Sequence, residues 1–226
     1  MERALLGAGH EVASINSRTL EGLPLTADVF VLAVKDAALT DVMRKATKGR
    51  EEQLFLHTAG SMPMTLFEGT THRYGVLYPM QTFSKERAVD FKEIPVFIEG
   101  CDEQTLSTIH QLAASITERV YPLSSADRQY LHLAAVFACN FTNHCYALAA
   151  SILEQHGMDF SIMLPLIDET ARKVHELHPV VAQTGPAVRY DENVIRHHAE
   201  LLQDHPQMKD LYERLSKSIY SFNGSR

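Results

Sequence analysis

The sequence predicts an α/β fold with a mostly parallel sheet, followed by an all-helical region. In the first half of the chain, short apolar and β-branched runs alternate with helical patterns, which is typical of a sheet with helices on both faces. From about residue 124 onward the strand pattern stops, and only long helical patterns follow. We therefore expect two domains, residues 1–122 and residues 123–226.

The N-terminal stretch predicts a short helix that ends at glycine. Residues 1–6 (MERALL) contain no Gly, Pro or β-branched residue, and Gly7 and Gly9 suit a helix C-terminus because glycine adopts the left-handed conformation at little cost. A short strand is expected next, around Val12 and Ile15. A phosphate-binding glycine loop fits less well, because such a loop follows a strand and precedes a helix, and Val12 occupies the place of the third glycine of GxGxxG.

Apolar runs predict the strands that follow, at residues 28–34, 53–61, 73–83 and 94–100. Together with the helical patterns between them, these runs indicate a Rossmann-type parallel sheet whose first strand and glycine loop are missing from this chain. Only residues 20–27 separate the segment NSRT from the first of these runs, too few for the usual helix and third strand. We therefore expect either a truncated gene or a sequence that omits segments.

The second half predicts an all-α C-terminal domain. One long helical pattern begins at a Ser124 or Ser125 cap and ends at Gly157. A second helix is expected to break or kink near Pro165, and two more helices are separated near Pro206.

The composition excludes several classes of function. A net charge of −7 over 226 residues argues against a general nucleic-acid binder, and no apolar stretch is long enough to span a membrane. The first residues carry charges and lack the apolar run of a secretion signal. The three cysteines have no CxxC spacing, which is typical of free thiols in a reducing compartment. We expect a cytoplasmic protein that acts on a small molecule.

Three segments contain residues suited to a nicotinamide cofactor. Ser17, Arg18 and Thr19 follow the expected second strand, where a hydroxyl and a guanidinium suit the 2′-phosphate of NADP and a carboxylate would suit NAD. Two further segments close buried strands, and ligands of open parallel sheets lie at the carboxyl ends of strands. Their candidate cofactor-binding residues are Ala33, Val34, Lys35, His57, Thr58 and Ser61. The alternatives are a solvated turn at residues 16–19 and a His57 that only caps its strand.

A polar stripe on the long helix predicts a catalytic site. At about 100° per residue, His132, Asn140 and Asn143 fall on one face together with small apolar residues. Such a stripe is either a buried hydrogen-bonded network or the wall of a site. We take His132 and Asn140 as candidate catalytic residues, with His132 moving a proton. Residues 78–84 (YPMQTFS) also carry hydrogen-bonding groups, although the proline favours an ordinary turn there.

A non-helical segment in the second half carries further candidates. Gly185-Pro186 favours a turn, and Gln183, Thr184 and Arg189 around it are candidate substrate-binding residues. Loops that interrupt a helical domain and carry an arginine often bind a ligand, here an anionic group. The alternative is a surface pair between Arg189 and Asp191. The twelve histidines show no recognisable metal-ligand spacing, so no metal site is expected.

Five segments together resemble one bacterial family: HTAGS, YGVLYPMQTFSK, HLAAVFACNFTNH, MLPLIDETARKVHE and AQTGPAVRYDE, in this order. The family is one of NADP oxidoreductases in which a Rossmann-like domain precedes a helical domain. It is similar to pyrroline-5-carboxylate reductase, the deazaflavin-dependent NADP reductases and the wider 6-phosphogluconate dehydrogenase-like superfamily. The resemblance implies binding of NADP, with NAD as the alternative, and a homodimer formed through the helical domain. The resemblance does not supply a substrate. From the candidate residues, above all Arg189, we expect hydride transfer between NADP and a small polar, anionic substrate. The rival interpretation is a non-catalytic Rossmann-like protein that binds a ligand or only dimerises.

Overall fold

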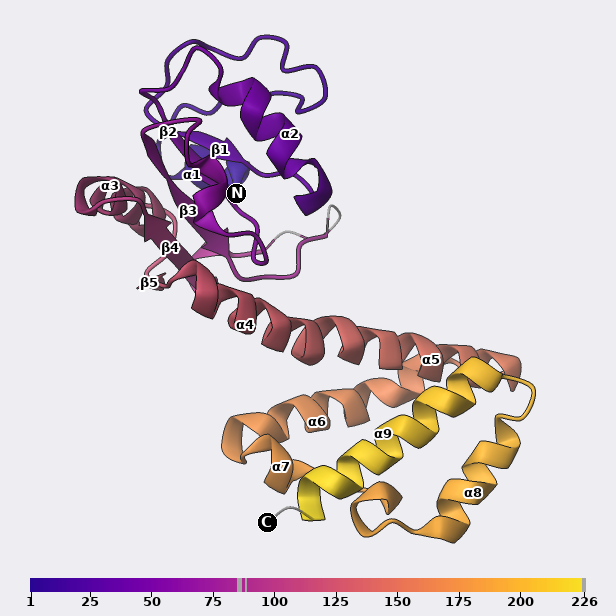
Figure 1. Cartoon of the computed structure of the whole chain (residues 1–226). Coiled ribbons are helices and arrows are strands. Elements are labelled where there is room, and N and C mark those ends of the chain that lie inside the picture. Colours follow the sequence, from indigo (N-terminus) through magenta and orange to yellow (C-terminus); the bar gives the residue numbers. More distant parts are fainter. Residues whose placement is uncertain (85–86, 88, 225–226) are drawn as a thin grey trace. The chain divides into compact units, whose positions relative to one another are not determined.

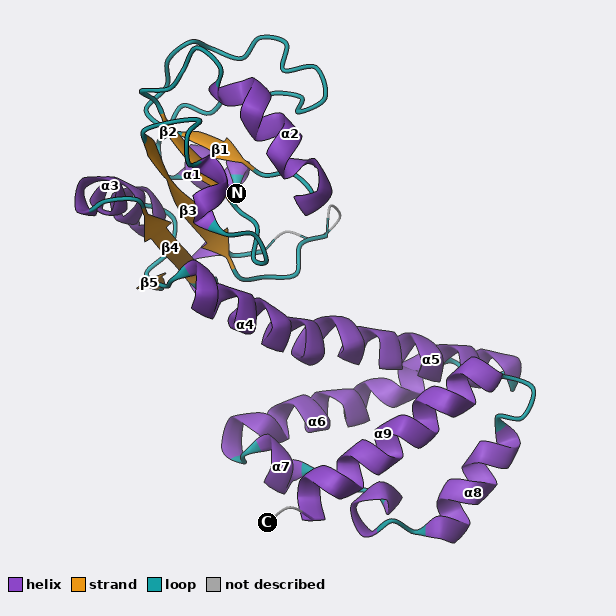
Figure 2. Ribbon diagram, viewed as in Figure 1, coloured by secondary structure: helices purple, strands orange, loops and turns teal. Residues whose placement is uncertain are grey.

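The structure, a computed structural model, describes residues 1–84, 87 and 89–224. It contains a five-stranded sheet followed by a series of helices (Figures 1 and 2), which confirms the predicted fold class. The chain divides into two compact units, Met1–Phe141 and Thr142–Arg226. This division falls inside the helical region, whereas the last strand ends at Pro122.

The sheet has the order β1-β2-β3-β4-β5, and only the β3–β4 pairing is antiparallel among the strands described. Because β1, β2 and β3 run parallel to one another, their carboxyl ends meet at one edge of the sheet. The strands are β1 (Phe30–Leu32), β2 (Leu54–His57), β3 (Arg73–Pro79), β4 (Val96–Gly100) and β5 (Val120–Pro122).

Helices surround the sheet in the first unit and make up the second. The first unit contains α1 (Glu2–Gly7), α2 (Asp36–Thr47), η1 (Met64–Phe67), η2 (Phe91–Glu93), α3 (Glu103–Ala114), α4 (Ser125–Ala135) and the π-helical segment η3 (Val136–Phe141). The second contains α5 (Thr142–Gln155), η4 (Phe160–Met163), α6 (Leu164–Glu176), α7 (Pro179–Ala182), η5 (Pro186–Arg189), α8 (Glu192–Leu201) and α9 (Pro206–Gly224). Among the described residues, no helix combines the length and the apolar character needed to cross a membrane.

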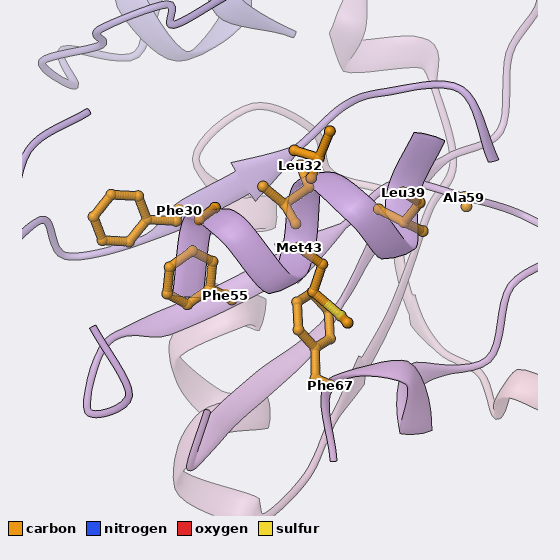
Figure 3. Close-up of a cluster of buried hydrophobic side chains, with 9 residues drawn as sticks. Phe30, Leu32, Leu39, Met43, Phe55, Ala59 and Phe67 are labelled. Atoms are coloured by element: carbon orange, nitrogen blue, oxygen red, sulfur yellow. The ribbon is translucent and has the colours of Figure 1, made fainter. Parts of the chain in front are cut away.

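Apolar side chains pack on both faces of the sheet. All four residues of β2 are buried, and its three apolar residues alternate between two clusters. Phe55 joins a cluster with Phe30 and with residues of α2 such as Met43 (Figure 3). Leu54 and Leu56 join a second cluster with β3, β4 and α3. Because both faces are covered, these strands are continuous apolar runs in the sequence.

The N-terminal glycines end a helix, as the sequence predicts. α1 stops at Gly7, and Gly9 has φ +89°, a conformation that glycine adopts without strain. Residues 10–19, which are all described, form coil and turn, so the prediction of a strand around Val12 and Ile15 is wrong. Val12 packs instead against a cluster that includes Leu5 of α1, because two isolated apolar residues are too few to specify a strand.

The helix caps and breaks predicted for the second half of the chain are confirmed. Ser124 caps α4, since its hydroxyl accepts a hydrogen bond from the Asp127 N–H at 3.1 Å. Gly157, with φ +69°, follows the end of α5. Pro165 lies in the first turn of α6 and α9 begins at Pro206, where a missing N–H costs no helical hydrogen bond.

Candidate functional site

A cavity of about 410 Å³ lies at the carboxyl ends of the three parallel strands β1, β2 and β3. In open α/β sheets this edge is where ligands bind. The residues that line the cavity are Met1, Ala33, Val34, Asp36, Thr58, Ala59, Gly60, Tyr78, Pro79, Gln81, Phe83 and His132. Most of those that follow β1 and β2 are small, so a ligand could approach the backbone closely there.

The cavity contains some of the predicted cofactor-binding residues. Ala33, Val34 and Thr58 line it. Lys35 is exposed at the N-cap of α2 and does not line the cavity. Ser61 also lies outside the lining, but its hydroxyl donates a short hydrogen bond to the carboxylate of Asp36, which does line the cavity.

His57 is fully buried and does not line the cavity. Its ring stacks on Phe67 at 5.8 Å, and its Nδ1 accepts a hydrogen bond from the Ala59 N–H at 3.2 Å. The proton of the neutral ring is therefore on Nε2, which has no hydrogen-bond partner among the described residues. Burial and then the charge of Arg128 lower the pKa of His57 to about 4. The backbone of Pro63 acts on the pKa of His57 in the opposite direction, although no hydrogen bond joins it to Nε2. His57 is thus a neutral core residue at pH 7.

His132 reaches the cavity from α4 and contacts the strand ends. Its Nδ1 lies 3.1 Å from the Tyr78 hydroxyl, and the two rings meet edge to face at 6.2 Å. Gly60 makes this approach possible, because a Cβ built at Gly60 would lie 2.6 Å from Nδ1 of His132 and 3.0 Å from Cζ of Tyr78. Burial raises the pKa of Tyr78, so its hydroxyl keeps its proton at neutral pH.

A buried ion pair holds α4 against the sheet, one helical turn before His132. Arg128 is 1% exposed, and its Nη1 lies 2.7 Å from Oε2 of Glu99 on β4. Its Nη2 donates to the backbone oxygen of Met62 at 2.6 Å. Ser125 adds two hydrogen bonds to Glu99, from its N–H at 2.8 Å and its hydroxyl at 2.6 Å. These contacts fix the position of His132 relative to the strand ends.

The structure does not bring Asn140 to the cavity. Asn140 is exposed and lies in the π-helical segment η3. A π-helix closes hydrogen bonds between residues i and i+5, so the rotation per residue is smaller than in an α-helix. The stripe of His132, Asn140 and Asn143 assumed α-helical geometry throughout, which η3 interrupts, and the catalytic role of Asn140 stays a prediction.

The segment suggested for the adenosine end of a cofactor forms an exposed turn. The Asn16 side chain accepts a hydrogen bond from the Arg18 N–H at 3.0 Å, and the Leu20 N–H donates to the Asn16 carbonyl at 2.8 Å. Arg18 and Thr19 are exposed and Ser17 is half-buried. In the described part of the chain the guanidinium of Arg18 has no ion-pair or hydrogen-bond partner, so it is available to a ligand.

The candidate substrate-binding residues lie in the second unit. Gln183 and Thr184 are exposed and joined by a hydrogen bond from the Gln183 amide to the Thr184 carbonyl at 3.1 Å. Arg189 ends the 3₁₀ turn η5 and is exposed. Asp191 caps α8 by accepting from the Val194 N–H, and no ion pair joins it to Arg189 among the described residues.

Sequence reasoning missed three residues that build the site: Tyr78, Gly60 and Arg128. Tyr78 lies in a segment whose hydrogen-bonding groups are visible in the sequence, but the adjacent proline favoured an ordinary turn. Gly60 and Arg128 carry no local signal, because their roles depend on contacts with residues far away in the chain. Across residues 1–84, 87 and 89–224, no three His, Cys, Asp or Glu side chains come together in a way that could hold a metal ion.

Comparison with known proteins shows which family shares this architecture. The family described as "Domain of unknown function (DUF2520)" matches residues 94–219. A structure from Bacteroides fragilis, of a provisionally assigned NADP oxidoreductase, is 48% identical, covers 97% of this chain and 92% of its own, and gives a TM-score of 0.92. Among curated proteins, no sequence matches the chain.

Two more distant structures share the fold. Imine reductase from Myxococcus stipitatus in complex with NADP⁺ is 13% identical over 88% of this chain and 74% of its own, with a TM-score of 0.53. Pyrroline carboxylate reductase from Plasmodium falciparum with NADP bound is 10% identical over 85% of this chain and 77% of its own, with a TM-score of 0.51. The resemblance indicated by the sequence motifs is confirmed, and the chain belongs to the DUF2520 domain family.

Proposed function

We propose that this protein is an NADP-dependent oxidoreductase that transfers a hydride between NADP and a small polar, anionic substrate. The observation that carries the proposal is the cavity at the carboxyl ends of β1, β2 and β3, which His132 enters from α4. The 48% identity to the provisionally assigned NADP oxidoreductase of Bacteroides fragilis, over nearly the whole chain, supports the same reaction class.

The residues of the cavity fit the nicotinamide half of the cofactor. Ala33, Ala59 and Gly60 have small side chains, so a flat ring could lie against the backbone at the strand ends. When bound, the cofactor supplies the hydride, and the protein orients the partners and moves a proton. His132 is the proton source that we propose.

The remaining candidate residues are assigned to the 2′-phosphate of NADP and to the substrate. The exposed Arg18, between Ser17 and Thr19, offers a charged fork for the 2′-phosphate of NADP. We assign Gln183, Thr184 and Arg189 to the substrate, because an exposed guanidinium without an ion-pair partner in the described part of the chain suits an anionic group. The three free cysteines support a reducing, cytoplasmic compartment.

We further propose a homodimer formed through the helical region. The chain exposes 15168 Å². Two separate compact units with the lengths of Met1–Phe141 and Thr142–Arg226 would together expose about 12,400 Å², from the usual scaling of surface with mass. The surplus of about 2,800 Å² per chain is of the size that obligate dimers bury. The helices α5 and α6, whose residues are all described, contain no buried residue although they carry apolar side chains such as Leu166 and Val174.

Cofactor titration tests the proposal. NADPH and NADH are titrated by calorimetry into the wild type, Arg18→Ala and the control Arg44→Ala, which removes an exposed arginine from α2. We expect NADPH to bind more tightly than NADH. Loss of a charge-assisted hydrogen bond should weaken NADPH binding to Arg18→Ala by about tenfold or more and leave NADH binding unchanged. Absence of NADPH binding to the wild type would contradict the proposal.

A second measurement separates an enzyme from a non-catalytic binding protein. NADPH oxidation is followed with a panel of small anionic carbonyl and imine compounds. Turnover of any member supports the enzyme, whereas binding without turnover of any member favours the non-catalytic ligand-binding alternative.

A further inference from the structure

We propose that Tyr78 and His132 form a proton relay, in which the Tyr78 hydroxyl protonates a carbonyl oxygen or imine nitrogen of the substrate and Nδ1 of His132 restores the proton. This inference rests on the proposed oxidoreductase function, and it narrows the substrate to compounds whose reduced double bond needs a proton at its heteroatom.

The geometry of the cavity carries the inference. Tyr78 and His132 both line the cavity, and the hydroxyl oxygen of Tyr78 lies 3.1 Å from Nδ1 of His132. Tyr78 stands near the carboxyl end of β3, beside the strand ends that would face a nicotinamide ring. Gly60 lets the His132 ring come this close, since any side chain there would strike Nδ1. The buried Arg128–Glu99 pair holds the helix that carries His132.

The balance of charge decides the direction of the relay. During reduction, the substrate carbon takes the hydride of reduced nicotinamide while the heteroatom takes a proton. If Tyr78 gave its proton without replacement, a tyrosinate would remain in a partly buried site. Burial raises the pKa of Tyr78, Arg128 acts in the opposite direction and Asp36 raises it further, so the tyrosinate is disfavoured.

A protonated His132 prevents a tyrosinate from remaining at Tyr78. Its Nδ1–H donates to the Tyr78 oxygen, and the O–H bond of Tyr78 breaks as a new O–H or N–H bond forms on the substrate. The Nδ1 proton then passes to the Tyr78 oxygen. The step ends with a neutral tyrosine and a neutral imidazole, and the imidazole regains a proton from water. Asp36 carries the other charged side chain among the residues that line the cavity.

Paired probes separate proton transfer from binding. Cyclopentanone needs a proton on oxygen when it is reduced, whereas N-methyl-1-pyrrolinium, a ring of the same size, accepts a hydride and needs none. Both are assayed with NADPH in the wild type, Tyr78→Phe and the control Tyr130→Phe, whose tyrosine is 75% exposed on α4. For Tyr78→Phe we expect a loss of about 100-fold in kcat with cyclopentanone and less than about 3-fold with the iminium. Tyr130→Phe should match the wild type with both.

Other outcomes overturn the relay. An equal loss with both probes means that Tyr78 shapes the cavity and donates no proton. If NADPH does not bind, the proposed function fails separately. In that case, or if the wild type binds NADPH but reduces neither of these uncharged or cationic probes, ¹⁵N NMR of His132 decides. A Nδ1 signal that moves in Tyr78→Phe and stays in place in Tyr130→Phe supports the pair, and an unchanged signal refutes it.

Discussion

Removal of the buried guanidinium of Arg128 should strongly destabilise the first unit, Met1–Phe141. The side chain is 1% exposed and donates to Glu99, Met62 and Ser125 at 2.7, 2.6 and 3.1 Å. In Arg128→Ala, the Glu99 carboxylate, 18% exposed, keeps only its two hydrogen bonds from Ser125. Breaking a buried pair by removing one partner costs about 3–5 kcal/mol, and the hydrogen bonds that Glu99 keeps favour the lower end. For a chain of this length, about 3 kcal/mol lowers Tm by roughly 6–12 °C.

Differential scanning calorimetry at one fixed protein concentration measures the effect. The control is Arg119→Ala, which breaks the exposed pair between Arg119 and Glu93 at 3.3 Å and should change Tm little. The double variant Arg128→Met/Glu99→Leu should be more stable than Arg128→Ala, because it leaves no unpaired charge in the interior. A Tm for Arg128→Ala that equals that of Arg119→Ala, or a double variant less stable than Arg128→Ala, would refute the reasoning.

Three further predictions follow from the same structure. The pKa of His57 is lowered from 6.5 to about 4, so the folded state resists protonation. The contribution of His57 to the free energy of unfolding should be fully present above about pH 6.5 and should fall by about 3 kcal/mol as the pH drops toward 4. The urea midpoint should fall with pH across this range in the wild type and in the exposed control His110→Gln. In His57→Gln it should depend on pH much less. Gly60→Ala should push the His132 ring away and cost about 1–3 kcal/mol in thermal melts, whereas Gly7→Ala, with open space around its Cβ, should cost far less. Light scattering at micromolar concentration should give the mass of a dimer for the wild type. Leu166→Glu, which changes a side chain that is 59% exposed, should give the mass of a monomer. A monomeric wild type would refute the dimer.

Local signals predict much of the fold. Apolar runs identify β1 to β4. Clusters of apolar side chains cover both faces of β1 and β2, and a strand covered on both faces needs apolar residues throughout. Caps and breakers such as Ser124, Gly157 and Pro206 mark helix ends, because their effect acts within a few residues. The strand expected near Val12 fails for the opposite reason, since only a neighbouring strand could have made that short run a strand.

The candidate site depends more on the tertiary structure. The sequence indicates that Ala33, Val34, Thr58 and His132 belong to it, because strand ends and a polar helix position can be recognised locally. Only the fold decides that Tyr78 meets His132 across 54 positions of the chain, that Gly60 leaves the space for this contact, and that His57 turns into the core. The π-helical segment that contains Asn140 is equally hidden in the sequence. Each of these outcomes depends on packing between segments far apart in the chain, and local residue type and spacing do not reveal such packing.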